Sequence, residues 1–157
     1  MEKETEQQLR PPATGEIPCG ASSRKLHLSM IRHLHFPNII EHNAPFSSVV
    51  MDDRYAFVAG VVAADFPAGR KVLGDVGEET HAVMSVINLI LDECGLDLSD
   101  VVRVDVHLAD LDDFDATNAV YASFFSPERY PARTCVESKK LYGGSLVEIT
   151  CMARLRA

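Results

Sequence analysis

The sequence predicts an α+β domain in which one β-sheet packs against two helices, in the order βββαβαββ. Three observations support this fold class. Residues 31–62 contain three short runs of alternating or β-branched residues, two later segments repeat their apolar residues with a helical period of 3.6, and a strand-like run follows each of those segments. Because strands and helices alternate from the third strand to the fifth, we expect crossover connections within a single sheet.

The composition fits one compact globular domain. The chain has 157 residues, of which 46% are hydrophobic and 24% are charged, so it can bury one core and is hardly long enough for two. No apolar run reaches the roughly 18 residues that a membrane helix needs. The formal net charge of -8 repels nucleic acid phosphates and makes nucleic-acid binding an unfavoured class.

The first 29 residues differ from the rest in composition. Residues 1–29 are dominated by Glu, Gln, Lys, Pro, Ser and Gly and show no hydrophobic period, so we expect a flexible tail before a single domain over residues 30–157. This segment lacks the basic and continuous apolar parts of a signal peptide. The four cysteines form no CxxC pair, which favours reduced thiols in a cytoplasmic protein.

The first three strands are expected at residues 31–36, 47–51 and 55–62. Residues 31–36 alternate apolar and polar side chains, and the other two runs are rich in β-branched and aromatic residues. The sequence Met-Asp-Asp-Arg between the second and third runs is typical of a tight turn. These two strands should therefore form a hairpin.

An amphipathic helix is expected directly after Asp75. Asp75 caps the first turn, Glu78 stands at the spacing of a capping box, and Gly95 ends the helix. The predicted buried stripe follows the helical period and comprises Val76, Thr80, Val83, Met84, Ile87, Ile90, Leu91 and Cys94.

The next strand and helix follow the same two periods. Strict alternation over residues 101–108 predicts a half-buried strand whose inward residues are Val102, Val104, Val106 and Leu108. The polar residues between them, His107 included, should face solvent. The segment 110–125 returns to helical spacing, and its predicted stripe is Leu111, Phe114, Tyr121 and Phe125. Its acidic residues favour a helix N-terminus over a calcium loop.

The last two strands, residues 133–138 and 146–155, are expected to pair antiparallel across a connection with two glycines. In this register Arg133 and Glu148 are diagonal neighbours, about 7–8 Å apart at Cβ. Such a pair is most often a surface salt bridge. Asn118 occupies an apolar-type position on the second helix and needs a partner there, either as a satisfied core amide or as part of a polar site.

Several motifs together resemble one protein family. The motifs are "PARTCVE" followed by "VEIT", "DVVRVDVHLADLDDFDATNAVYASFF" upstream, and a "G-D-x-x-x-x-T" helix start. They resemble the reactive intermediate deaminases, also called Rid, YjgF-like or L-PSP-like proteins, over residues 30–155. The resemblance implies a chorismate-mutase-like fold, a homotrimer whose sheets form a central barrel, and an intersubunit cleft. It also implies hydrolysis of 2-imino and 2-enamino acids to 2-keto acids and ammonia, without metal or organic cofactor.

The resemblance assigns roles to four residues. Arg133 is expected to bind the substrate carboxylate, a task that suits the planar guanidinium. Glu148 is expected to activate the attacking water as a general base. Asn118 matches a residue that lines the site in the family, and Cys135 matches a cysteine beside it whose backbone, not its thiol, is expected to matter.

Two residues depart from the family pattern. Phe46, in "NAPFSS", stands where the family usually has a tyrosine, and Ala59 stands where it usually has a serine before the glycine, here Gly60. Both changes remove hydroxyl donors from the expected substrate-binding site. A bulkier or less polar substrate is one explanation, and loss of the standard activity is another.

The sequence therefore leaves alternatives open. The first is a deaminase of imine or enamine acids, 2-aminomuconate-type substrates included. The second is a non-catalytic trimer that binds a small carboxylate as a sensor or scaffold. A ribonuclease or translation inhibitor is disfavoured, since no basic, aromatic RNA-binding face is visible. A metal site at His33 and His35 is disfavoured too, because no carboxylate accompanies them.

Overall fold

A computed structural model describes residues 31–41 and 43–156, and the expected tail, Cys19 and His42 lie outside the described residues. Its elements follow the predicted order βββαβαββ. The strands are β1 (Arg32–Leu34), β2 (Val49–Met51), β3 (Tyr55–Val62), β4 (Val101–Leu108), β5 (Ala132–Glu137) and β6 (Val147–Arg154), and the helices are α1 (Val76–Glu93) and α2 (Phe114–Ala122). The α+β fold class and the β2–β3 hairpin are confirmed.

The six strands of the described residues belong to one sheet in the order β1-β2-β3-β6-β4-β5. The pairs are antiparallel except for β4 and β5, which run parallel because α2 crosses over between them. The predicted pairing of the last two strands is therefore wrong, since β4 lies between β5 and β6. The turn after β5 does not close a hairpin; it carries the chain past β4 to the middle of the sheet.

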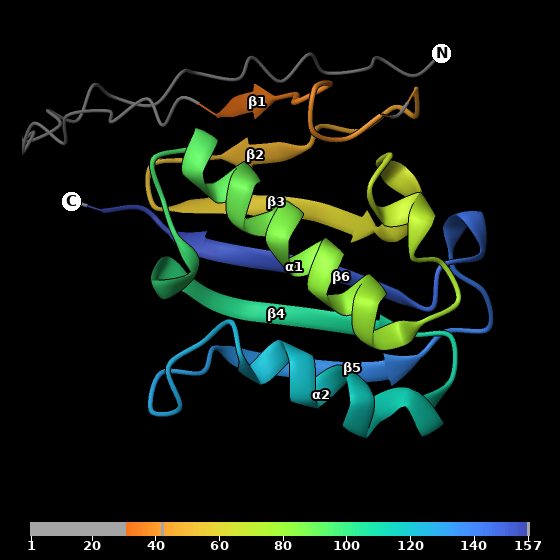
Figure 1. Cartoon of the computed structure of the whole chain (residues 1–157). Helices are drawn as coiled ribbons and strands as arrows, with labels where there is room; N and C mark the ends of the chain where they lie inside the picture. Colours follow the sequence, from red (N-terminus) through yellow and green to blue (C-terminus); the bar gives the residue numbers. More distant parts are fainter. Residues whose placement is uncertain (1–30, 42, 157) are drawn as a thin grey trace, which may run out of the picture.

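Both helices cover one face of the sheet, and the hydrophobic core lies between the two layers (Figure 1). The α1 residues of the core include Val83, Met84, Ile87 and Leu91, as predicted. From the sheet, every second residue of β6 points into this core, beginning with Val147 and Ile149. The residues between them, Glu148 first, point to the opposite face.

At the start of α1, the predicted N-cap is present, but the predicted capping-box partner is a different glutamate. The Asp75 carboxylate accepts a hydrogen bond from the Glu78 N–H, as expected of an N-cap. Glu79, not Glu78, reaches back, accepting a hydrogen bond from the Gly74 N–H at 2.8 Å. At the other end Gly95 has a φ of 74°, the left-handed conformation that ends many helices.

Three predicted inward residues are exposed. Val102 is 39% exposed because a register shift between Val101 and Arg103 breaks the alternation of β4 against β6. Leu111 and Phe114 are also exposed, so the buried stripe of α2 is narrower than predicted and consists of Thr117 and Tyr121.

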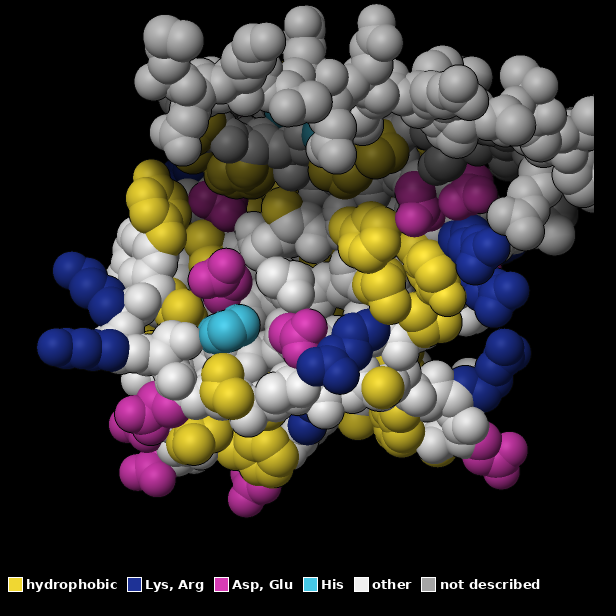
Figure 2. All heavy atoms as spheres, turned by 180° about the vertical axis from the view of Figure 1, so that it is seen from behind, with side chains coloured by type: hydrophobic (Ala, Val, Ile, Leu, Met, Phe, Trp, Pro, Cys, Tyr) yellow, Lys and Arg dark blue, Asp and Glu magenta, His cyan; other side chains and the backbone are white. Residues whose placement is uncertain are grey.

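No helix of residues 31–41 or 43–156 covers the other face of the sheet. Figure 2 shows this face from behind, with hydrophobic, basic and acidic side chains mixed on it. Phe57 on β3 and Val136 on β5 are large apolar residues exposed there. No helix of the described residues is long and apolar enough to span a membrane.

Candidate active site

Arg133 and Glu148 lie on opposite faces of the sheet. Arg133 pairs in register with Val104, whose side chain points into the core beneath the helices. Glu148 pairs with His107 and points to the open face. The two residues are also two strand spacings apart, on the order of 10 Å sideways. They are therefore not the diagonal neighbours predicted from a hairpin, and they cannot meet one substrate within a single chain.

The guanidinium of Arg133 is held from three sides by α2. Its Nη2 donates a hydrogen bond to Oδ1 of Asn118 at 2.6 Å. Its Cζ lies 4.6 Å from the ring centroid of Tyr121 and 5.7 Å from that of Phe114, both within range of cation–π attraction. The polar Asn118 thus has the partner that its position on the helix requires. The guanidinium has five N–H donors, so donors remain for a ligand.

A shallow pocket of about 460 Å³ opens beside this guanidinium. The residues that line it are Asn118, Tyr121, Ala122, Tyr130, Pro131 and Arg133. A planar cation with aromatic neighbours is suited to a carboxylate, which it can bind through two parallel hydrogen bonds.

Tyr121 lines this pocket with a buried hydroxyl. The residue is only 4% exposed, and among the described residues neither its hydroxyl nor Oγ1 of Thr117, one turn earlier, has a hydrogen-bond partner. Burial raises the pKa of Tyr121 to about 12, although the nearby Arg133 works in the opposite direction. The phenol is therefore neutral at physiological pH.

Cys135 lies two residues after Arg133 and on the same face of β5. Burial raises the pKa of its thiol above the usual value, and Arg133 only partly offsets this effect. A protonated thiol is a poor nucleophile. The role of Cys135 stays a prediction.

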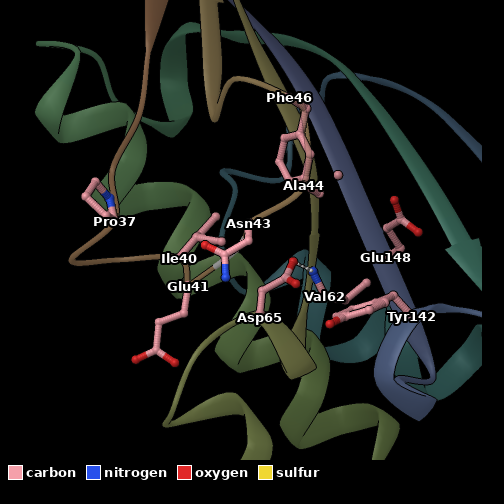
Figure 3. A pocket seen from close by; sticks show the side chains of 11 residues that line it. Pro37, Ile40, Glu41, Asn43, Ala44, Phe46, Val62, Asp65, Tyr142 and Glu148 are labelled. Atoms are coloured by element: carbon pink, nitrogen blue, oxygen red, sulfur yellow. Dashed lines mark hydrogen bonds between the residues drawn. The ribbon is translucent and has the colours of Figure 1, made fainter.

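Glu148 lines a second pocket, of about 650 Å³ (Figure 3). Phe46, Val62, Asp65 and Tyr142 also line this pocket, so the structure brings Phe46 and Glu148 together as the sequence suggested. The Asp65 carboxylate accepts a hydrogen bond from the Val62 N–H at 3.4 Å, which fixes the chain directly after β3.

A β-bulge in β3 makes room for the Glu148 side chain. Ala59 and Gly60 lie between the registered pairs Val58–Cys151 and Val61–Ile149, so two residues of β3 face one of β6. A Cβ atom at Gly60 would lie 2.1 Å from Oε1 of Glu148. With Glu148 in this conformation, only glycine leaves enough space at this position. Ala59 is not among the described residues that line the pocket; its N–H donates to the carbonyl oxygen of Ser48 at 3.0 Å.

The start of β6 is anchored by a buried carboxylate that the sequence analysis missed. Glu79 is 0% exposed, and its Oε2 accepts a hydrogen bond from the Leu146 N–H at 2.8 Å, two residues before Glu148. Its other oxygen binds the Gly74 N–H, so one carboxylate joins the start of α1 to the start of β6. The sequence contains an indication of this burial, because Glu79 stands three residues after Val76 and four before Val83, on the apolar stripe of the helix.

Two further residues near Glu148 were not predicted as part of a site. Tyr142 lines the same pocket, at the start of the turn Tyr142–Gly144. His107, expected in solvent, is half-buried, with Nδ1 3.1 Å from Oγ of Ser138, and it is the strand partner of Glu148. No cluster of three or more metal-ligating side chains occurs among the described residues, and Nδ1 of His33 is 3.1 Å from Oγ of Ser47.

Comparisons with known proteins identify relatives over most of the chain. A family model described as Endoribonuclease L-PSP matches residues 37–155. A RutC family protein of Pyrococcus abyssi is 40% identical over 109 residues, which cover 69% of this chain and 85% of the relative. A human protein named 2-iminobutanoate/2-iminopropanoate deaminase is 34% identical over 109 residues, covering 69% of this chain and 79% of the relative.

Solved structures are similar as well. The YjgF gene product of E. coli superimposes with a TM-score of 0.70 at 25% identity, covering 80% of this chain and 99% of that chain. A member of the YjgF protein family from Neisseria meningitidis gives a TM-score of 0.67 at 28% identity, with 83% and 99% covered.

Proposed function

Since this chain belongs to the endoribonuclease L-PSP family, which includes the Rid and YjgF proteins, we propose that it is a deaminase of 2-imino and 2-enamino acids. The products are a 2-keto acid and ammonia. The reaction needs neither a metal nor an organic cofactor in this proposal, because a guanidinium and a carboxylate supply the required chemistry. Relatives named 2-iminobutanoate/2-iminopropanoate deaminase support this choice of reaction.

The observation that carries the proposal is the separation of Arg133 and Glu148 by the sheet. Each lines a pocket of its own, on opposite faces, so a joint site needs Arg133 from one chain and Glu148 from another. The open face of the sheet, which exposes Phe57 and Val136, is the surface available for assembly. We propose a homotrimer with three such intersubunit sites, as the family resemblance implies.

The two residues divide the reaction between them. Arg133 binds the substrate carboxylate, with Asn118 and Tyr121 holding its guanidinium in place. Glu148 accepts a proton from water while the water oxygen bonds to the C=N carbon, and it gives this proton to the nitrogen, which forms a carbinolamine. The hydroxyl proton of the carbinolamine then passes through Glu148 to the amino nitrogen as the C–N bond breaks, which releases ammonia and leaves the 2-keto acid.

Mixed trimers test this division. Imines are generated from amino acids by an amino-acid oxidase, and their hydrolysis is followed in competition with trapping by semicarbazide. Arg133→Ala and Glu148→Gln are each expected to slow hydrolysis about a hundredfold or more. Co-expression of the two inactive chains should restore about one site in four, because that fraction combines an intact arginine with an intact glutamate from its neighbour.

The mixed trimers also provide the control. Mixing the two chains after separate purification, under conditions in which subunits do not exchange, should restore nothing. If co-expressed trimers that contain both chains stay inactive, the intersubunit site is wrong. If the unaltered protein hydrolyses no imine, the deaminase proposal is wrong.

A second candidate is a non-catalytic trimer that binds a small carboxylate at Arg133. The observation that favours it is the absence of a hydroxyl at Phe46, which lines the Glu148 pocket. Small carboxylates would then raise the melting temperature of the protein, and no imine would be consumed. The family description names a ribonuclease, but the net charge of -8 on this chain disfavours binding of the RNA phosphates.

A further inference from the structure

Two exposed aromatic rings share the pocket of Glu148. Phe46 is 38% exposed and Tyr142 is 72% exposed, although both are large side chains that are usually more buried. In the view of Figure 3, the Phe46 ring lies above the Glu148 carboxylate and the Tyr142 ring below it. A ligand that reaches Glu148 therefore enters a pocket that both aromatic residues line.

The turn that carries Tyr142 is firmly fixed, in spite of the exposure of its side chain. Gly143 and Gly144 have φ values of 65° and 79°, a left-handed conformation that other residues rarely adopt. A Cβ atom at Gly143 would lie 2.2 Å from Cβ of Ala64, so the turn packs directly on the chain after β3.

Hydrogen bonds hold the far end of this turn. The buried Ser145 accepts one from the Ala64 N–H at 3.2 Å, and the next residue, Leu146, donates to Glu79 at 2.8 Å. On the near side Leu141 is buried. Because the backbone of this turn is anchored and tyrosine has only two χ angles, Tyr142 loses little conformational entropy when its ring contacts a ligand.

The remaining lining of the pocket indicates what kind of side chain fits. Val62 and Ile40 contribute apolar surface, whereas the space at Gly60 is taken up by the Glu148 carboxylate. None of the described residues that line the pocket is lysine or arginine, whereas Glu41, Asp65 and Glu148 are acidic. Arg70, which is outside this lining, is already paired with Glu41 at 2.7 Å, so a second carboxylate on the substrate would find no unpaired cation among the described lining residues.

We propose that Phe46 and Tyr142 form a side-chain subsite that selects 2-imino acids with bulky, uncharged side chains, either aromatic or branched. This inference rests on the proposed deaminase function and specifies the substrate within it. Arg133 of the neighbouring chain binds the single carboxylate, and the apolar side chain lies between the two rings. Small imino acids leave the rings exposed, and dicarboxylic imino acids, such as 2-aminomuconate-type compounds, are excluded.

Competing substrates test the subsite. Imines are generated from phenylalanine, alanine and glutamate, and kcat/KM is measured for each. The unaltered protein should prefer the phenylalanine-derived imine. Tyr142→Ala and Phe46→Ala should lower the ratio of kcat/KM for the phenylalanine-derived over the alanine-derived imine about tenfold, the usual effect of lost apolar contacts in a pocket. Tyr142→Phe keeps the ring and should keep the ratio.

The outcomes separate this inference from the proposed function. Leu89→Ala changes an exposed apolar residue of α1 outside the pocket and should leave the ratio unchanged. A preference for the alanine- or glutamate-derived imine overturns the subsite and leaves the deaminase intact. An equal loss for all three imines, or loss of the native oligomeric state in Tyr142→Ala, also overturns it. If no imine is hydrolysed, the proposed function fails, and the subsite with it.

Discussion

The Arg133 pocket and the Glu148 pocket are built in different ways. Arg133 is held by side chains, through the hydrogen bond to Asn118 and the rings of Tyr121 and Phe114. Glu148 is positioned mainly by backbone, through the bulge at Gly60 and the anchored start of β6. We therefore expect substitutions on the Glu148 side to disturb the fold and the site together. Substitutions on the Arg133 side should act more on binding than on stability.

The largest effect is expected from Gly60→Ala, which changes the β-bulge beside Glu148. The added methyl group would overlap Oε1 of Glu148, so activity should fall about a hundredfold and the free energy of unfolding by about 2–3 kcal/mol. Activity assays and urea unfolding measure the two effects. Glu148→Ala removes all three side-chain atoms that the new Cβ would meet.

A double-mutant cycle therefore checks the reason for that loss. Gly60→Ala should cost much less stability in a Glu148→Ala background than in the unaltered protein. An equal cost in both backgrounds would show that the bulge needs glycine for its backbone alone.

Glu79→Gln should produce the next largest effect, again on the Glu148 side. One carboxylate oxygen becomes an amide NH₂ group that faces an N–H donor, either that of Gly74 or that of Leu146. Leaving a buried donor unpaired should lower the free energy of unfolding by about 2 kcal/mol. Urea unfolding measures this loss of stability, and Glu78→Gln, one residue earlier and exposed, is the matched control. If the two variants are equally stable, Glu79 is not an anchor.

Asn118→Ala weakens the Arg133 pocket without altering the backbone. Without the hydrogen bond to Asn118, the Arg133 guanidinium loses one of the contacts that fix its orientation. KM for the imine should therefore rise about tenfold, while kcat changes less. Steady-state kinetics separate the two parameters. Asn88, on the exposed side of α1, supplies the control variant Asn88→Ala. A fall in kcat with an unchanged KM would argue against a role in binding.

The smallest effect is expected from Tyr121→Phe, which removes a buried hydroxyl without a partner among the described residues. At pH 9 the variant should be more stable than the unaltered protein by about 1 kcal/mol. The pKa of Tyr121 is raised from 10.0 to about 12, so the folded state binds its proton more tightly than the unfolded state. Its contribution to stability is complete below about pH 10 and is lost as pH rises towards about 12.

The advantage of Tyr121→Phe should therefore be larger at pH 11 than at pH 9. Urea unfolding at the two pH values measures it. A variant that is less stable at pH 9 would mean that the hydroxyl has a partner in solution, such as a buried water molecule.

The sequence alone determined the elements that depend on local pattern. The boundaries of α1 follow from Asp75, from its apolar stripe and from Gly95, because capping and helical period involve residues only a few positions apart. The β2–β3 hairpin follows from its turn for the same reason. The polar Asn118 at an apolar-type position of α2 indicates that its side chain needs a partner, although the sequence does not decide which partner.

Only the tertiary structure decided which strands are neighbours, and with this the nature of the site. Strand period fixes which residues of β5 share a face, but not that β4 pairs between β5 and β6, because that pairing brings together segments far apart in the chain. The exposure of Val102 and the burial of Glu79 likewise result from contacts with β6. Arg133 and Glu148 therefore looked like neighbours in the sequence and lie on opposite faces in the fold.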